Sequence, residues 1–136
     1  MDDNFWVWGI RSAGLFHFVT VALAMRTPIP PGWNENLNRL PELHRRFAIA
    51  QNAAIGAVMV VLGVVCLGFA TELVAGTPLA QLWCGAIAFW WGGRLALLPW
   101  LNVKPALGTP WLRIGFAALQ TQCAIYAIAF GWLALR

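Results

Sequence analysis

The chain has 136 residues, of which 60% are hydrophobic and only 10% are charged, whereas a soluble globular domain carries about 25% charged residues. A transmembrane helix needs about 18 or more consecutive apolar residues. Several runs of the sequence reach this length, which excludes a soluble globular protein. The formal net charge of +4 is therefore evidence about topology rather than about nucleic acid, because membrane proteins concentrate Lys and Arg in cytoplasmic segments.

The first apolar segment, residues 5–25, is predicted to be a membrane helix. It follows an acidic start, where a signal peptide would be basic, so we expect it to be retained rather than cleaved. Three prolines within residues 28–31 end the helix, because proline cannot continue one. In residues 33–43, apolar side chains recur at helical spacing between polar ones, which is typical of a short helix lying in the headgroup region.

Three further spans are predicted at residues 44–70, 79–103 and 111–135, separated by short connections. In the second span, Ala53, Gly56, Val60 and Gly63 form a stripe of small side chains that favours close helix packing. The predicted fold is an all-α integral membrane protein. It is one domain, residues 1–136, built as an antiparallel bundle of four transmembrane helices with a short interfacial helix between spans 1 and 2.

The distribution of charge predicts the orientation of the bundle. Basic residues gather at the first and third connections: Arg26, Arg39, Arg45, Arg46, Lys104 and Arg113. The opposite side has mostly acids: Asp2, Asp3 and Glu72, with Arg136. The positive-inside rule then places loops 26–46 and 104–110 in the cytoplasm and both termini outside. We expect the bacterial cytoplasmic membrane.

Polar side chains from all four spans fall in one zone of the predicted cytoplasmic half. At about 1.5 Å rise per residue, His17, Arg94 and Gln120 each lie about 13 Å from that face, and Gln51 and Asn52 lie about 8 Å from it. Polar groups in hydrocarbon need partners, so these five side chains are predicted to form one buried network.

Arg94 is the residue of this network that most needs an explanation, because its charge lies within the membrane and no acidic residue in its span can pair with it. One interpretation is that it extends toward the cytoplasmic headgroups. A second is that it binds a lipid phosphate, a small anion or a quinone carbonyl between the helices, with Trp90 and Trp91 beside it. A third is that it pairs with another subunit. The candidate ligand-binding residues are therefore Arg94, His17, Gln51, Asn52, Gln120, Trp90 and Trp91.

Residues for catalysis or cofactor binding are not evident in the sequence. His17 is expected to be a hydrogen-bonded core residue, with a proton relay or ligand role as the alternative. His44, at the membrane surface, lies too far from it for a bis-histidine haem. Cys66, Cys84 and Cys123 are expected to be packed free thiols, with a disulfide between the first two as the alternative. No cofactor and no metal are predicted.

Two functions remain open on the sequence alone. The first is a non-enzymatic accessory or assembly subunit of a membrane complex, favoured by the small size and the absence of a catalytic set of residues. The second is a binder or carrier of a lipid, a quinone or a small anion at Arg94. Expected partners are the lipid bilayer and other membrane subunits or further copies of the chain, but not nucleic acid.

Overall fold

The computed structural model describes residues 3–26 and 32–136, which form seven helical segments. Four of them are long: α1 (Asp3–Arg26), α3 (Glu42–Gly68), α5 (Pro78–Leu101) and α6 (Pro110–Leu135). The short ones are α2 (Trp33–Asn38), α4 (Ala70–Val74) and a 3-10 turn, η1 (Lys104–Ala106). The predicted proline-rich turn lies outside the described residues.

Local sequence explains where the last two long helices begin. The Thr77 hydroxyl accepts a hydrogen bond from the Ala80 amide at 3.2 Å, and Pro78 occupies the first turn of α5. Thr109 does the same for Leu112 at 3.3 Å, with Pro110 starting α6. A hydroxyl cap satisfies an amide that has no helical partner, and proline has no amide to satisfy, so both helices start where the sequence provides this pair.

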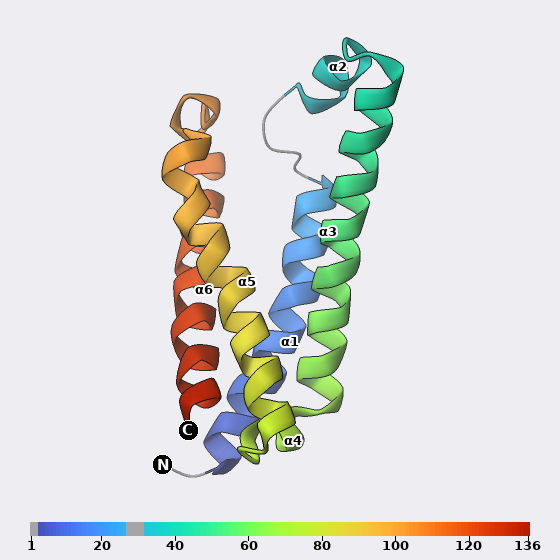
Figure 1. The fold of residues 1–136 in the computed structure, drawn as a ribbon. Coiled ribbons are helices and arrows are strands. Elements are labelled where there is room, and N and C mark those ends of the chain that lie inside the picture. Colours follow the sequence, from blue (N-terminus) through green and yellow to red (C-terminus); the bar gives the residue numbers. More distant parts are fainter. Residues whose placement is uncertain (1–2, 27–31) are drawn as a thin grey trace.

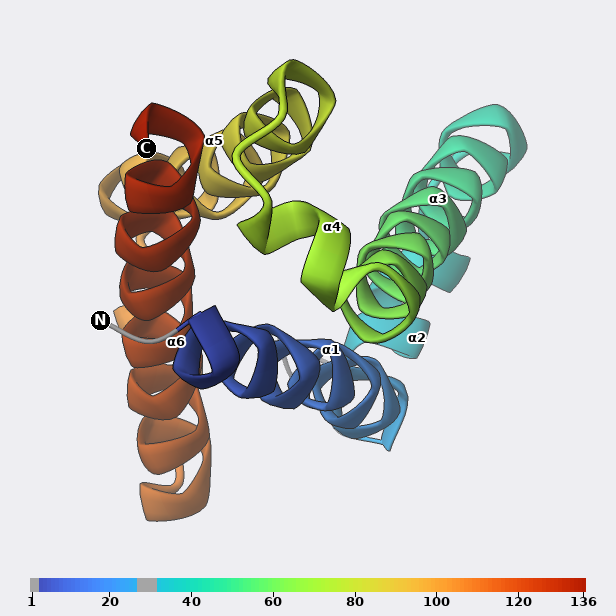
Figure 2. The ribbon, with the colours of Figure 1, turned by 90° about the horizontal axis from the view of Figure 1, so that it is seen from below.

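The long helices form two antiparallel hairpins, α1 with α3 and α5 with α6 (Figure 1). The hairpins meet at one end, where α4 lies between them (Figure 2). They diverge toward α2 and η1. We call these the closed end and the open end. An ion pair of 2.7 Å between Asp3 and Arg136 joins α1 to the terminus of α6 at the closed end.

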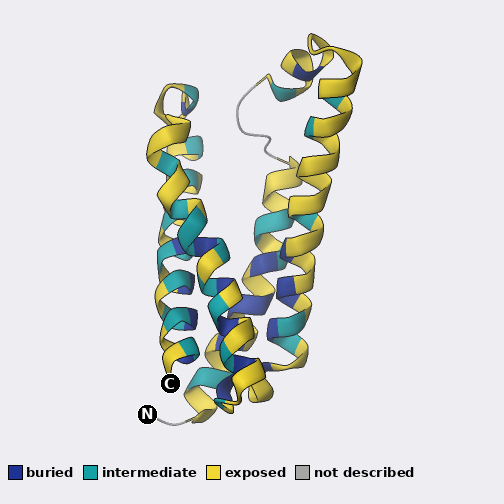
Figure 3. Ribbon diagram, in the orientation of Figure 1, coloured by how far each residue is buried: buried dark blue, intermediate teal, exposed yellow. Residues whose placement is uncertain are grey.

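Burial follows this shape. The core lies in the half of the molecule toward the closed end, whereas the half toward the open end has mostly exposed side chains (Figure 3). Between α1 and α3 the backbones approach closely: a Cβ on Gly14 would lie 3.0 Å from the Gly63 carbonyl oxygen. Of the predicted small-residue stripe, Gly63 therefore serves helix packing, while a Cβ on Gly56 would meet nothing within 4 Å.

Within the described ranges, three helices are long and apolar enough to cross a membrane: α1, α3 and α6. The expectation of an all-helical membrane protein is confirmed to that extent. Two details of the connections differ from the sequence prediction. The second long helix ends at Gly68, not 70, because Phe69 leaves helical geometry (φ −122°, ψ 28°) and α4 follows, where only a link was expected. The third connection contains η1 rather than a simple turn.

Candidate functional site

The carbonyl oxygen of Ala13 is one of two places where side-chain hydrogen bonds join α1 and α6 in the described structure. It lies 2.7 Å from Nδ1 of His17, one turn further along α1. It also accepts a hydrogen bond of 2.9 Å from the Tyr126 hydroxyl, which reaches across from α6. A carbonyl oxygen has two lone pairs but no hydrogen to give, so Nδ1 of His17 must carry the proton.

His17 is fully buried and uses both ring nitrogens. With its proton on Nδ1, Nε2 is an acceptor, and it accepts a hydrogen bond of 3.2 Å from Nε1 of Trp91 on α5. The two partners thus assign one neutral tautomer, Nδ1–H. His17 is the hydrogen-bonded core histidine that the sequence favoured.

The three rings of His17, Trp91 and Tyr126 pack on one another, and we call this set the aromatic junction. His17 stacks on Tyr126 at 5.1 Å between centroids, and Trp91 meets both rings edge-on at 5.3 and 5.2 Å. Such geometries fall in the favourable range for aromatic pairs. The junction links α1, α5 and α6, and therefore joins the two hairpins.

A second polar contact lies one turn closer to the open end. Thr20 Oγ1 lies 2.9 Å from Oε1 of Gln122 and 2.8 Å from the carbonyl oxygen of Phe16. The Gln122 Nε2 atom is buried without a partner among the described residues. Turning the amide over would let Nε2 donate to Thr20 but would leave Oε1 unpaired, so one polar atom of Gln122 lacks a partner either way.

The predicted network of five polar side chains is not formed in the described structure. Gln51, Asn52 and Arg94 are exposed, and Gln120 is half-buried. No side-chain hydrogen bond or ion pair of these four residues is found within the described ranges. Only His17 and Trp91, of the predicted site residues, bond to each other. Trp90 is half-buried, and its buried Nε1 atom has no hydrogen-bond partner among residues 3–26 and 32–136.

Helix geometry explains why the other predicted members stay apart. Asn52 is two turns before the buried Met59 on α3, and Arg94 is two turns after the buried Ile87 on α5. Each therefore lies on the face of its helix that is buried nearer the closed end. Asn52 is sixteen residues before the end of α3 and Arg94 sixteen after the start of α5, so both lie about 24 Å along their helices from the closed end. Both residues lie at a similar distance from the closed end, but the hairpins have diverged at this level (Figure 1).

Tyr126, the only tyrosine of the chain, was missed as a site residue. Its one available signal was its position, four residues after Gln122 and six after Gln120, which places it near the same level of the last helix. The three cysteines are buried free thiols, as expected, and Cys84 Sγ lies 3.7 Å from the Leu73 carbonyl oxygen. No group of three or more potential metal ligands occurs in the part of the chain that the structure describes.

Comparisons of the chain with protein-family models, with curated proteins and with solved structures found no match. The geometry of the two hairpins and the side chains on their facing surfaces therefore provide the only indications of function in the described structure.

Proposed function

We propose that all four long helices cross the membrane. The support for α5 comes from its partner: α5 packs antiparallel along α6, with Gly85 against Ala134 and Gly92 against Ala127. Because α6 is itself long and apolar enough to span, a bilayer around α6 also encloses α5. The 24 residues of α5 match the length of α1.

In this arrangement the open end faces the cytoplasm of a bacterial cell, both termini lie outside, and α2 lies in the headgroup layer. The basic residues at the open-end connections support this orientation through the positive-inside rule. The position of α2 in the headgroup layer is supported by its amphipathic character, since Leu37 is buried while its polar neighbours are exposed.

Within that membrane, the chain acts as a non-enzymatic accessory or assembly subunit of a larger complex. The observation that carries this proposal is the exposure of Asn52 and Arg94 on the inner faces of the diverging hairpins. An amide and a guanidinium at this depth are costly unless they are paired. A helix of another subunit that supplies hydrogen-bond acceptors between the hairpins meets this requirement.

Site-specific crosslinking tests the proposal. A photoreactive amino acid replaces Asn52 on the inner face of α3, and in a separate variant it replaces Phe89, which is 83% exposed on α5. We expect a covalent adduct with one defined protein from position 52 only, and loss of that adduct when Arg94→Leu is added. The subunit proposal fails if position 52 reacts only with lipid, or if both positions give the same adducts.

A second candidate function is the binding of a ligand rich in hydrogen-bond acceptors, such as a lipid phosphate, a quinone or a small anion. It is favoured by two buried nitrogen atoms, Trp90 Nε1 and Gln122 Nε2, for which the described part of the chain provides no hydrogen-bond partner. Trp90 lies one turn before Arg94 on the same side of α5, so one acceptor group can meet both side chains. Under this alternative, the purified monomer retains a small molecule, and Trp90→Phe and Arg94→Gln each reduce its retention.

A further inference from the structure

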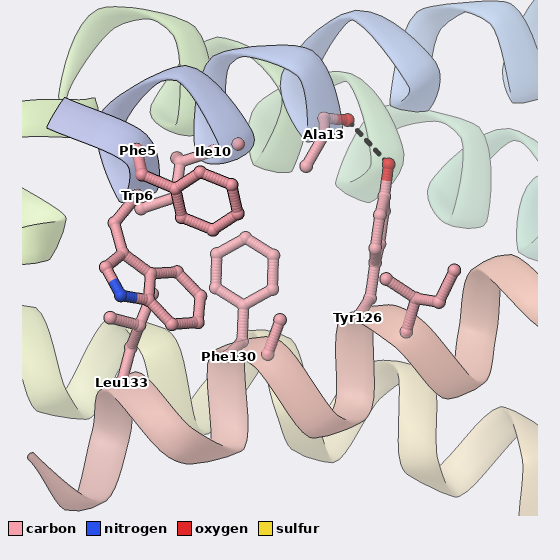
Figure 4. Close-up of a pocket in the computed structure, with 10 residues that line it drawn as sticks. Phe5, Trp6, Ile10, Ala13, Tyr126, Phe130 and Leu133 are labelled. Carbon is pink, nitrogen blue, oxygen red and sulfur yellow. Dashed lines mark hydrogen bonds between the residues drawn. The ribbon is translucent and has the colours of Figure 1, made fainter. Parts of the chain in front are cut away.

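A second feature of the molecule lies on the side of α1 that faces α6, below the aromatic junction. It is a pocket of about 250 Å³ between the two helices, open on one side. Figure 4 shows the rings of Phe5, Trp6 and Phe130 around it and Tyr126 crossing to Ala13 at its inner limit. Both helices that form it are long and apolar enough to span a membrane, so its open side faces lipid.

The chemistry of the lining selects an apolar occupant. Among the ten lining residues, only Trp6 and Tyr126 carry a polar side-chain atom, and the Tyr126 hydroxyl already donates to the Ala13 carbonyl. Gly9 contributes to the width of the pocket, because a Cβ at this position would meet nothing within 4 Å. A polar headgroup would find no partners inside, whereas hydrocarbon would gain contacts on two sides.

The dimensions of the pocket select a single chain. Its α1 wall runs from Phe5 to Ala13, about 12 Å at about 1.5 Å per residue. One leaflet contributes about 15 Å to a hydrocarbon core of about 30 Å, so the pocket spans most of one leaflet. A volume of about 250 Å³ over that length gives a width of about 5 Å. Carbon atoms in contact lie about 3.5–4.0 Å apart, so one hydrocarbon chain fits. A helix, about 10–12 Å wide, does not fit.

We propose that this pocket is a binding site for one acyl chain of a phospholipid in the leaflet at the closed end. The lipid lies with its headgroup at the Asp3–Arg136 ion pair and with its chain along α1 toward Tyr126. The pair is accessible to a headgroup, since the Asp3 and Arg136 side chains are 68% and 38% exposed. Arg136 donates to Asp3 through one nitrogen, which leaves other N–H groups for a lipid phosphate.

Photolabelling of the full chain in phosphatidylcholine vesicles tests the site. Two probes carry a diazirine on the acyl chain, one near the ester and one near the chain terminus, and the labelled residues are identified by mass spectrometry. We expect the ester-proximal probe to label around Phe5 and the distal probe around Ile125. Ile128, which is 73% exposed on the same helix at nearly the same depth, reports ordinary lipid contact. Labelling at Ile125 should exceed that at Ile128 several-fold.

A matched pair of variants separates a site from general contact with lipid. Gly9→Leu places a side chain in the pocket and should lower the labelling of Ile125 to the level of Ile128. Gly115→Leu, at a position of α6 that also has open space and does not line the pocket, should leave labelling unchanged. Ala129→Leu fills the pocket from α6 and replaces Gly9→Leu if that variant does not fold.

Three results would overturn the proposal: equal labelling of Ile125 and Ile128 in the original chain, a reversed depth order of the two probes, or labelling that neither filling variant reduces. Absence of labelling at both isoleucines is a case of equal labelling and overturns the proposal in the same way. None of these results depends on whether a subunit binds between the hairpins at Asn52 and Arg94.

Discussion

Replacement of Tyr126 by Phe removes one hydroxyl group and keeps the ring that stacks on His17 and meets Trp91 edge-on. The lost interaction is the 2.9 Å hydrogen bond to the carbonyl oxygen of Ala13. That oxygen keeps the His17 Nδ1 donor at 2.7 Å, so the substitution leaves no buried acceptor without a partner. The expected cost is therefore only the net value of one hydrogen bond within a membrane protein, about 0.6 kcal/mol and at most about 1.7 kcal/mol.

His17→Phe makes a stronger perturbation at the same place. It removes both ring hydrogen bonds and leaves Nε1 of the fully buried Trp91 without an acceptor. Two bonds at about 0.6 kcal/mol each, plus about 1–3 kcal/mol for an unsatisfied buried donor, give a cost of about 2–4 kcal/mol. The ratio of the two costs in unfolding free energy, His17→Phe against Tyr126→Phe, tests the hydrogen bonds of the aromatic junction better than either cost alone.

Equilibrium unfolding in mixed micelles of a mild detergent and dodecyl sulfate, followed by far-ultraviolet circular dichroism, measures both free energies. We expect His17→Phe to reduce the free energy of unfolding more than Tyr126→Phe does, and Trp91→Phe to cost less in a His17→Phe background than alone. Equal effects of the two single substitutions, or full additivity of His17→Phe with Trp91→Phe, would refute the assigned hydrogen bonds.

Two other predictions concern helix packing and topology. Gly14→Val should destabilise the protein by about 1–3 kcal/mol in the same unfolding assay, as overpacking does, because a Cβ there lies 2.8 Å from Leu67 Cγ and 3.0 Å from the Gly63 carbonyl oxygen. A Cβ at Gly56 would meet nothing within 4 Å, so Gly56→Ala should leave the stability unchanged or raised. Equal losses of stability in Gly14→Val and Gly56→Ala would show that α1 and α3 do not approach closely at Gly14. A cysteine at Asn36 in α2 should react with a membrane-impermeant thiol reagent in inverted vesicles but not in intact cells, because α2 is proposed to lie on the cytoplasmic side. The three native cysteines are buried and should add little background. Reaction in intact cells would reverse the proposed orientation.

Hydropathy and turn chemistry predicted the long helices well, because a span is a property of a continuous run of residues. Both ends of each of the four long helices were located to within two residues, and Thr77–Pro78 and Thr109–Pro110 explain where two of them begin. The break at Phe69 was not predictable in this way. It lies inside an apolar sequence, directly after Gly68 and without a proline, and it becomes necessary only because α4 must cross from one hairpin to the other.

The candidate site was predicted less completely, and the reason is geometric. Depth along each helix follows from counting residues, and it placed Asn52 and Arg94 in one zone, about 8 and 13 Å from the predicted cytoplasmic face. Counting carries no information on how far apart the helices are, so it could not show that the hairpins diverge there. Tyr126 illustrates the same limit: its contact with Ala13 depends on the placement of α6 against α1, which no sequence pattern specifies.

The proposal that the chain is one subunit of a larger membrane complex is tested most directly by native mass spectrometry of the protein, extracted from its own membrane in a mild detergent. The exposed Asn52 and Arg94 predict a stoichiometric assembly, with another protein or with further copies of this chain, that Arg94→Leu weakens. A monomeric chain of 15.0 kDa, unchanged by that substitution and free of any protein partner, would contradict the account.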